Sequence, residues 1–139
     1  MRVIMAGSRG INDYAQLCYA VQRSGFPISR ILSGMARGVD ALAVRFAKEK
    51  GLPLDPFPAQ WSKYGRSAGY KRNVEMADNA DALIAVWDGN SPGTRHMIQV
   101  AKARRLQVFV AQPHQLHPRP AQRVLHIREN RLTIYSRGA

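Results

Sequence analysis

A single cysteine, Cys18, is present among 139 residues, so the chain cannot form an internal disulfide. This excludes the small secreted scaffolds that depend on several disulfides. No stretch approaches the ~20 consecutive apolar residues of a membrane span, and the first residues lack the apolar core of a signal peptide. We therefore expect a protein of the reducing cytoplasm that makes no membrane contact.

Acidic residues are also scarce. Nine Asp and Glu stand against 21 Lys and Arg, which gives a formal net charge of +12. Sixteen of the basic residues are arginine, whose planar guanidinium forms paired contacts with phosphate or carboxylate. The excess is greatest in residues 62–72 and from Lys102 onward. Such a charge attracts nucleic acids, nucleotides or an acidic protein, but it also fits an arginine-rich protein with no polyanionic partner.

Apolar runs alternate with segments of helical periodicity, which predicts an α/β fold with a mainly parallel sheet. About five strands are expected, at residues 2–6, 30–33, 53–57, 82–87 and 107–111. Two prolines in the third run, Pro53 and Pro56, favour an edge of the sheet or the end of a strand over its centre. Residues 59–72 are predicted to be a loop, and the next helix is predicted at 73–80.

Residues 112–139 are predicted to be a basic extension of the core at residues 1–111, within the same domain. Three prolines between residues 113 and 122 indicate a linker. Two apolar runs, at 123–127 and 132–135, flank a polar turn and predict a C-terminal β-hairpin.

Glycine-rich segments follow three of the predicted strands, and each precedes a helix. They are residues 7–10 (GSRG), 33–40 (SGMARGVD) and 88–94 (DGNSPGT). The carboxyl ends of parallel strands share one edge of a sheet, and a helix N-terminus offers free amides to an anion. One such glycine is often only a turn requirement, and no P-loop or Gly-x-Gly-x-x-Gly motif is present. Three of these segments with Arg9, Arg37 and Arg72 favour a phosphate or nucleotide site.

Several segments taken together match the pattern of a known family. They are Gly7-Ser8-Arg9, residues 33–43 (SGMARGVDALA), residues 57–61 (FPAQW), Ala68-Gly69, Arg72-Asn73, Met76, residues 80–89 (ADALIAVWDG) and Ser91-Pro92-Gly93-Thr94. In these segments residues 1–111 resemble the YspA-type, cpYpsA-related branch of the SLOG superfamily. The resemblance implies a Rossmann-like three-layer sandwich that binds nucleotides or nucleotide-derived ligands. It also implies self-association into a homo-oligomer, and an origin in a phage or mobile element.

Relatives within the superfamily include LOG-type phosphoribohydrolases, molybdenum-cofactor carrier proteins and the DNA-processing protein DprA. The LOG-type enzymes carry Pro-Gly-Gly-x-Gly-Thr-x-x-Glu, whose glutamate serves cleavage of the N-glycosidic bond. Here Met97 stands at the glutamate position, and it cannot take up a proton. The resemblance therefore does not by itself imply that enzymatic activity.

The predicted ligand-binding residues come from the strand ends and from the segments that carry the resemblance. They are Gly7, Ser8, Arg9, Ser33, Gly34, Ala36, Arg37, Gly38, Asp40, Ala59, Trp61, Gly69, Arg72, Asn73, Asp88, Gly89, Ser91, Gly93 and Thr94. The catalytic candidates are Arg72, Asp40 and Asp88. No cofactor motif is evident, and Mg²⁺ held by Asp40 or Asp88 is the one metal hypothesis.

Individual residues leave alternatives open. Asp40 is expected to bind a ribose hydroxyl or a metal, or to pair with Arg37 or Arg9. Asp88 either contacts a ligand or caps the following helix. Asn73 is predicted to cap a helix that begins beside it, which leaves Arg72 as the better ligand-binding candidate. Trp61 either stacks on a base or packs in a core or an interface.

Three functions remain open at this point. The first is a binding module for a nucleotide or a nucleotide-derived signal, acting as a sensor or a sequestering protein. The second is a hydrolase that acts on the glycosidic or phosphate bond of a nucleotide. The third is DprA-like binding of nucleic acid through the basic surface.

Overall fold

The computed structural model describes residues 1–113. The predicted hairpin and most of the linker before it lie outside these residues. Five strands form one sheet in the order β3-β2-β1-β4-β5, and every neighbouring pair is parallel. The strands are β1 (Arg2–Gly7), β2 (Arg30–Ser33), β3 (Leu54–Pro56), β4 (Ala82–Val86) and β5 (Gln107–Ala111). This confirms the Rossmann-like α/β fold.

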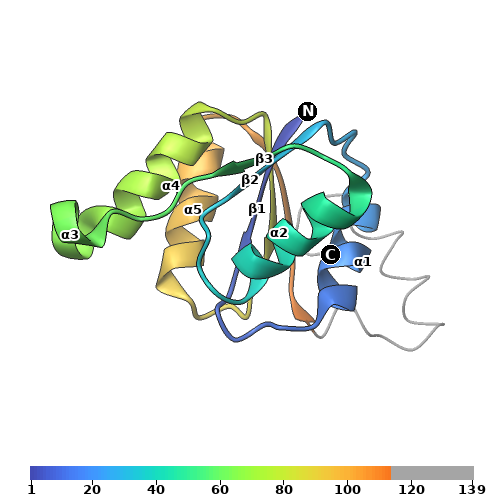
Figure 1. Ribbon diagram of the computed structural model, residues 1–139, viewed down its shortest axis with the longest axis horizontal. Coiled ribbons are helices and arrows are strands. Elements are labelled where there is room, and N and C mark those ends of the chain that lie inside the picture. Colours follow the sequence, from blue (N-terminus) through green and yellow to red (C-terminus); the bar gives the residue numbers. More distant parts are fainter. Residues whose placement is uncertain (114–139) are drawn as a thin grey trace.

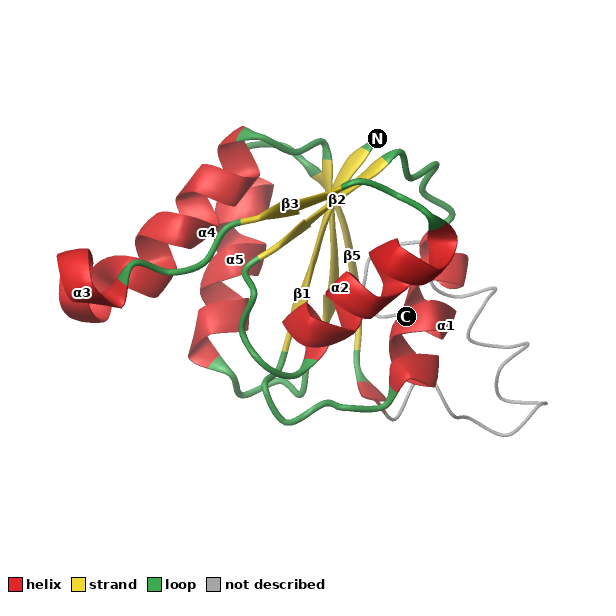
Figure 2. Ribbon diagram, in the orientation of Figure 1, coloured by secondary structure: helices red, strands yellow, loops and turns green. Residues whose placement is uncertain are grey.

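Helices cover both faces of the sheet and form the outer layers of a three-layer sandwich (Figure 1, Figure 2). The helices are α1 (Tyr14–Ser24), α2 (Val39–Lys50), α3 (Trp61–Tyr64), α4 (Ala68–Asp78) and α5 (Pro92–Ala103). α1 and α2 pack on one face, and α4 and α5 pack on the other. Each strand interior therefore faces apolar side chains on both sides.

The burial of the strands explains their composition. All five residues of β4, Ala-Leu-Ile-Ala-Val, are fully buried, as expected for a central parallel strand covered on both faces. β3 lies at an edge of the sheet and ends at Pro56, which confirms the position predicted from its prolines.

Residues 59–72 differ from the sequence prediction. Instead of a loop, the chain forms α3, a 3-10 turn at Gly65–Ser67 and the first residues of α4. Glycine and aromatic residues in this segment suggested a loop. However, Gly69 lies in the first turn of α4, and a side chain there would meet the Trp61 ring at 3.4 Å. The segment is helical although its glycines give it a weak helix propensity. α3 stands apart from the sheet, at the left of Figure 1.

Two glycines permit close backbone approaches, one between the end of β1 and β4 and one between the loops after β2 and β1. A Cβ on Gly7 would lie 2.1 Å from the Val86 carbonyl oxygen, on the neighbouring strand. Gly38 has φ of 77°, and its Cβ would lie 2.4 Å from the Ser8 carbonyl oxygen. Both obstacles are backbone atoms that cannot move aside without shifting a strand or a loop. These two positions therefore require glycine.

The Gly38→Ala substitution tests this close approach. We expect it to lower the free energy of unfolding by at least about 2 kcal/mol, because alanine is strained at this φ and its methyl group meets backbone. The matched control is Gly10→Ala, where an added Cβ has nothing within 4 Å. That control should change stability by less than about 0.5 kcal/mol. Chemical denaturation measures both, and equal effects would contradict the close approach of the two loops.

Candidate functional site

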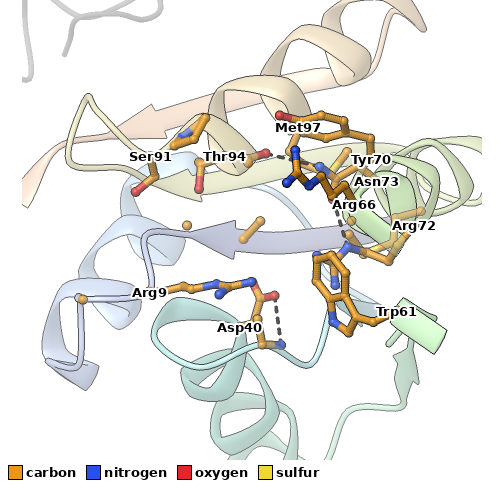
Figure 3. Close-up of a pocket in the computed structure, with 18 residues that line it drawn as sticks. Arg9, Asp40, Trp61, Arg66, Tyr70, Arg72, Asn73, Ser91, Thr94 and Met97 are labelled. Carbon is orange, nitrogen blue, oxygen red and sulfur yellow. Dashed lines mark hydrogen bonds between the residues drawn. The ribbon is translucent and has the colours of Figure 1, made fainter. Parts of the chain in front are cut away.

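A cavity of about 450 Å³ lies at the carboxyl end of the sheet. The chain runs from β1 outward to β2 and β3, and then returns to the other side of β1 to form β4 and β5. Ligands of open α/β sheets bind in the crevice where the strand order reverses in this way. The cavity is lined by Ala6, Gly7, Arg9, Gly10, Ala36, Asp40, Trp61, Arg66, Gly69, Tyr70, Arg72, Asn73, Met76, Ser91, Pro92, Gly93, Thr94 and Met97 (Figure 3).

Ser8 joins the loops that surround this cavity. Its side chain is buried, and its hydroxyl oxygen accepts a hydrogen bond from the Asp88 amide at 2.9 Å. The same hydroxyl lies 3.1 Å from the Ser91 hydroxyl. The Ser8 carbonyl accepts from the amide of Val39, the first residue of α2, at 3.3 Å. One serine therefore connects the loops after β1 and β4 with the start of α2.

Hydrogen bonds between residues at the two ends of the loop from β2 to α2 fix its conformation. The Ser33 hydroxyl donates to the Asp40 carbonyl at 2.9 Å and accepts from the Met35 amide at 3.1 Å. The Asp40 carboxylate accepts from the Ala36 amide at 3.2 Å. Ser33 is fully buried, so these bonds replace water that the loop would otherwise need. They hold the loop against the cavity.

Arg72 crosses from α4 to the loop after β2. Its Nη1 donates to the Gly34 carbonyl at 2.5 Å and approaches the Phe57 carbonyl at 3.4 Å. Its Nε donates to Asn73 Oδ1 at 3.0 Å. The guanidinium is thereby fixed beside Asp40, and a Cβ on Gly34 would meet both groups. Among residues 1–113, no hydrogen bond engages Arg72 Nη2, so one edge of the guanidinium is available to a ligand.

Asn73 does not cap a helix, contrary to the prediction. It is the sixth residue of α4, because α4 begins at Ala68, and its side chain is buried. Its Nδ2 donates to the Gly93 carbonyl at 3.2 Å and contacts His96 Nδ1 at 3.1 Å. Since Nδ2 can only donate, His96 Nδ1 accepts and the His96 proton sits on Nε2. Asn73 therefore holds α4 against the first turn of α5.

Asp40 is the one carboxylate among the described residues that line the cavity. It is 7% exposed, and burial raises its pKa to about 6, although Arg72, the Ala36 amide and Arg9 all favour the ionised form. Figure 3 shows the Arg9 side chain reaching towards Asp40. The sequence suggested Arg37 and Arg9 as partners of Asp40, and of these two it is Arg9 whose charge acts on Asp40. Arg72 acts on it as well, which the sequence did not suggest. A carboxyl group with such a pKa exchanges a proton near neutrality.

Aromatic rings and a further arginine line the rim of the cavity. Trp61 is 52% exposed and Tyr70 is 48% exposed, which is unusual for such large rings. Tyr70 also packs on the His96 ring, with centroids 4.4 Å apart. Arg66 lies on the same side of the cavity as Tyr70 (Figure 3). The rim therefore offers flat apolar surface next to positive charge.

The N-terminus of α5 forms another wall, which the hydrogen bond between Asn73 and the Gly93 carbonyl joins to α4. Pro92 is its first residue, and no acidic side chain occupies its first turn. Gly93 and Thr94 therefore present their amides in a region of positive potential. Met97 lines the cavity below them and is 1% exposed. This wall combines anion-binding amides with an apolar floor.

The structure separates the predicted site residues into groups. Eleven of them line the cavity: Gly7, Arg9, Ala36, Asp40, Trp61, Gly69, Arg72, Asn73, Ser91, Gly93 and Thr94. Ser8, Ser33 and Gly38 are buried and build the loops beneath it. Gly34, Arg37 and Ala59 line a neighbouring hollow.

Asp88 and Gly89 line neither space, although both follow the buried strand β4. The Asp88 carboxylate accepts from the amides of Asn90 and Ser91 at 2.8 and 2.9 Å. These bonds hold its own loop together and lower the pKa of Asp88. Asp88 therefore does not cap α5, whose N-cap is Ser91, but holds the loop before this helix, and it lines no ligand space.

Arg66 and Tyr70 line the cavity but were not among the predicted site residues. Because residues 59–72 were predicted to be a loop, no shared face was assigned to these two side chains. Once the segment is helical, Arg66, Tyr70 and Asn73 follow one another at spacings of four and three residues and share one face. That spacing is the signal by which the sequence could have revealed them.

Neither a membrane helix nor a metal cluster is found in the part of the chain that the structure describes. No helix within residues 1–113 is long and apolar enough to cross a membrane. Within the same residues, no three His, Cys, Asp or Glu side chains are grouped so that they could hold a metal ion. Binding of Mg²⁺ stays a prediction.

Comparisons with known proteins agree with this architecture. The family model described as YAcAr (YspA, cpYpsA-related SLOG family) matches residues 1–64. The chain is 33% identical to the Gene 61 protein of Mycobacterium phage D29, over 78% of this chain and 94% of that protein. The chain belongs to the YspA, cpYpsA-related SLOG family. Most of the segments that carry the family resemblance contribute residues to the lining of the cavity.

A solved structure extends the comparison to the fold. DNA processing protein A (DprA) from Streptococcus pneumoniae superimposes with a TM-score of 0.60 at 16% identity, over 78% of this chain and 49% of the DprA chain. This SLOG-family chain thus spans about half the length of DprA, and at this identity the likeness concerns the fold alone.

The pH dependence of stability tests the environment of Asp40. The unfolded chain loses the Asp40 proton near pH 3.8, whereas the folded protein keeps it to about pH 6. Unfolding therefore releases a proton in this interval, and the free energy of unfolding contributed by Asp40 falls as the pH rises through it. At about 1.4 kcal/mol per pKa unit, we expect the Asp40→Asn variant to gain about 1–3 kcal/mol relative to the wild type between pH 4 and 7.

The control is Asp81→Asn, at an exposed carboxylate whose pKa is lowered by hydrogen bonds from Arg2. There the wild type should gain relative to the variant as the pH rises towards about 4, and the difference should stay nearly constant between pH 4 and 7, where Asp81 is ionised in both the folded and the unfolded state. Urea denaturation at each pH measures both series. A stability difference between Asp40→Asn and wild type that does not change with pH would show that Asp40 is not desolvated.

Proposed function

We propose that this protein binds a nucleotide or a nucleotide-derived small molecule in the cavity at the carboxyl end of the sheet. The observation that carries the proposal is the composition of this cavity, in which three arginines, Arg9, Arg66 and Arg72, surround a space bounded by the α5 N-terminus. Phosphate groups are recognised by such amides and guanidinium groups. A volume of about 450 Å³ falls within the usual range for ligand sites.

Each part of a nucleotide has a matching surface in this arrangement. The amides of Gly93 and Thr94 and the unused edge of Arg72 suit the phosphate. Asp40 suits a ribose hydroxyl, which can donate to its carboxylate. The exposed Trp61 ring suits a base, since stacking on an aromatic side chain contributes about 1–3 kcal/mol per base. In these assignments the phosphate lies at the α5 N-terminus and Arg72, the ribose lies at Asp40, and the base lies at the rim.

We place binding ahead of catalysis because Met97 occupies the position that would otherwise supply an acid. Its thioether lines the cavity and can neither donate nor take up a proton at ordinary pH. A protein that binds a nucleotide without consuming it acts as a sensor or a sequestering protein. The similarity to a phage protein supports a role of this kind in a phage or mobile element.

Ligand-induced stabilisation tests the proposal. A panel of nucleoside mono-, di- and triphosphates is screened by thermal shift, and a ligand present at 100 times its Kd should add about 2.7 kcal/mol. The Arg72→Gln variant should then bind that ligand about 10- to 100-fold more weakly, because it loses a charged hydrogen bond.

The matched control is Arg105→Gln, an exposed arginine just after α5, at the opposite end of that helix from the cavity. This change removes the same charge from the protein and should leave the affinity within about twofold. If no member of the panel stabilises the wild type, or if both variants bind equally, the proposal fails.

A hydrolase is the second candidate, and Asp40 is the observation that favours it. A buried carboxyl group with a pKa of about 6 at the edge of a cavity has the properties of a general acid. Incubation with nucleoside monophosphates, followed by chromatography for free base, measures this activity. We expect Asp40→Asn to reduce any such release by about 100-fold or more. Release that persists in the variant would exclude Asp40 as the acid, and no release from the wild type would exclude this function.

A further inference from the structure

A second hollow of about 330 Å³ adjoins the cavity. Four residues line both spaces and form the wall between them: Arg9, Ala36, Trp61 and Arg72. The second hollow is completed by Gly34, Met35, Arg37, Pro58 and Ala59, from the loops after β2 and β3. Each space is by itself large enough for part of a ligand, since ligand sites range from about 300 to 1,000 Å³. The two therefore form neighbouring compartments of one site.

The shared wall concentrates positive charge. Arg9 and Arg72 both belong to it, and the charge of Arg9 contributes to lowering the pKa of Arg72, after the larger effect of burial. Asp40 is the nearby carboxylate, and its own desolvation opposes full ionisation. An anion that contacts both guanidinium groups offsets the repulsion between them. An anion bound at this wall is therefore accessible from both compartments.

The second compartment has apolar surface and a charge of its own. Met35 is 43% exposed, and its backbone has φ of 63°, a left-handed conformation that is uncommon for a residue other than glycine. The hydrogen bond from its amide to the Ser33 hydroxyl holds it there. Pro58 and Ala59 provide further apolar atoms, and Arg37 provides a cation. The first compartment repeats this combination with Tyr70 and Arg66.

From this arrangement we infer that the ligand has two heads joined by an anionic linker, as in a dinucleoside diphosphate. The linker lies against Arg9 and Arg72, and one nucleoside occupies each compartment. This inference rests on the proposed function and specifies its ligand class. A mononucleotide would fill the first compartment and leave Arg37 and Met35 without a role.

Single-stranded nucleic acid is the alternative occupant, because two adjacent nucleotides also have two heads. Their linker is a phosphodiester, which carries one negative charge, whereas a diphosphate linker carries two. Two arginines in the shared wall match the diphosphate better. Nucleic acid would also extend along the exposed basic side chains of α3 and α4, such as Lys63 and Lys71, and its binding would depend steeply on salt.

Isothermal titration calorimetry with three kinds of probe tests the inference. Dinucleoside diphosphates with two identical heads, in adenine, guanine, cytosine and uracil forms, are compared with the matching nucleoside mono- and diphosphates and with a hexathymidylate oligonucleotide. We expect one dinucleoside diphosphate to bind at least about tenfold more tightly than its mono- and diphosphate counterparts. The diphosphates separate the effect of linker charge from that of the second head.

The Arg37→Gln variant assigns the second head to its compartment. Arg37 is exposed and makes no hydrogen bond within residues 1–113, so the variant should fold normally. It should reduce the ratio of dinucleotide to mononucleotide affinity about tenfold, whereas Arg105→Gln should leave that ratio unchanged. The inference is overturned if the wild type binds dinucleotide and mononucleotide equally well, or if Arg37→Gln does not lower the ratio of the two affinities. In either case, binding of a mononucleotide would still support the proposed function. Tighter binding of hexathymidylate with a steep salt dependence also overturns it, and no binding of any probe refutes both.

Discussion

The hydrogen bonds of Ser8 are the constraint on which the site depends. Three loops that lie far apart in the sequence meet because the hydroxyl and carbonyl of this one buried residue bind the Asp88 amide, the Ser91 hydroxyl and the Val39 amide. Backbone groups at strand ends have lost their sheet partners, so each needs another. Ser8 supplies these partners without introducing charge, and glycine at 7 and 38 leaves room for the backbones to meet. The cavity is the space that these connected loops enclose.

Two opposing effects set the charge state of the site: burial disfavours the charged form of Asp40, whereas neighbouring arginines and an amide favour it. Asp40 is surrounded by Arg72, Arg9 and an amide, all of which favour its charge, yet desolvation outweighs them and raises its pKa. Burial also lowers the pKa of Arg72. Each charged group has therefore lost hydration that its neighbours replace only in part. An anionic ligand can supply the missing interactions for the arginines, which is why an arginine-rich cavity with one acid suits a phosphate-bearing molecule.

Much of the fold followed from the residue pattern alone, because strand burial and helix periodicity are local consequences of sequence. The five strands, the edge position of β3 and the three glycine-rich loops at one edge of the sheet agree with the structure. The segment at 59–72 did not follow, because its glycines and aromatic residues give a weak helix signal although α3, the 3-10 turn and α4 form there. That error placed Asn73 at a helix start and left Arg66 and Tyr70 out of the predicted site.

The sequence by itself determined which chemical groups the strand ends carry: glycines, arginines, two acids and free helix amides. Only the tertiary structure decided how they are divided. Ser8, Ser33 and Gly38 hold the loops together, Asp88 binds its own loop, and Arg72 reaches from α4 to a carbonyl 38 residues away. The reason is that a hydrogen bond between distant segments depends on the packing of whole helices against the sheet, which no local pattern of residues encodes.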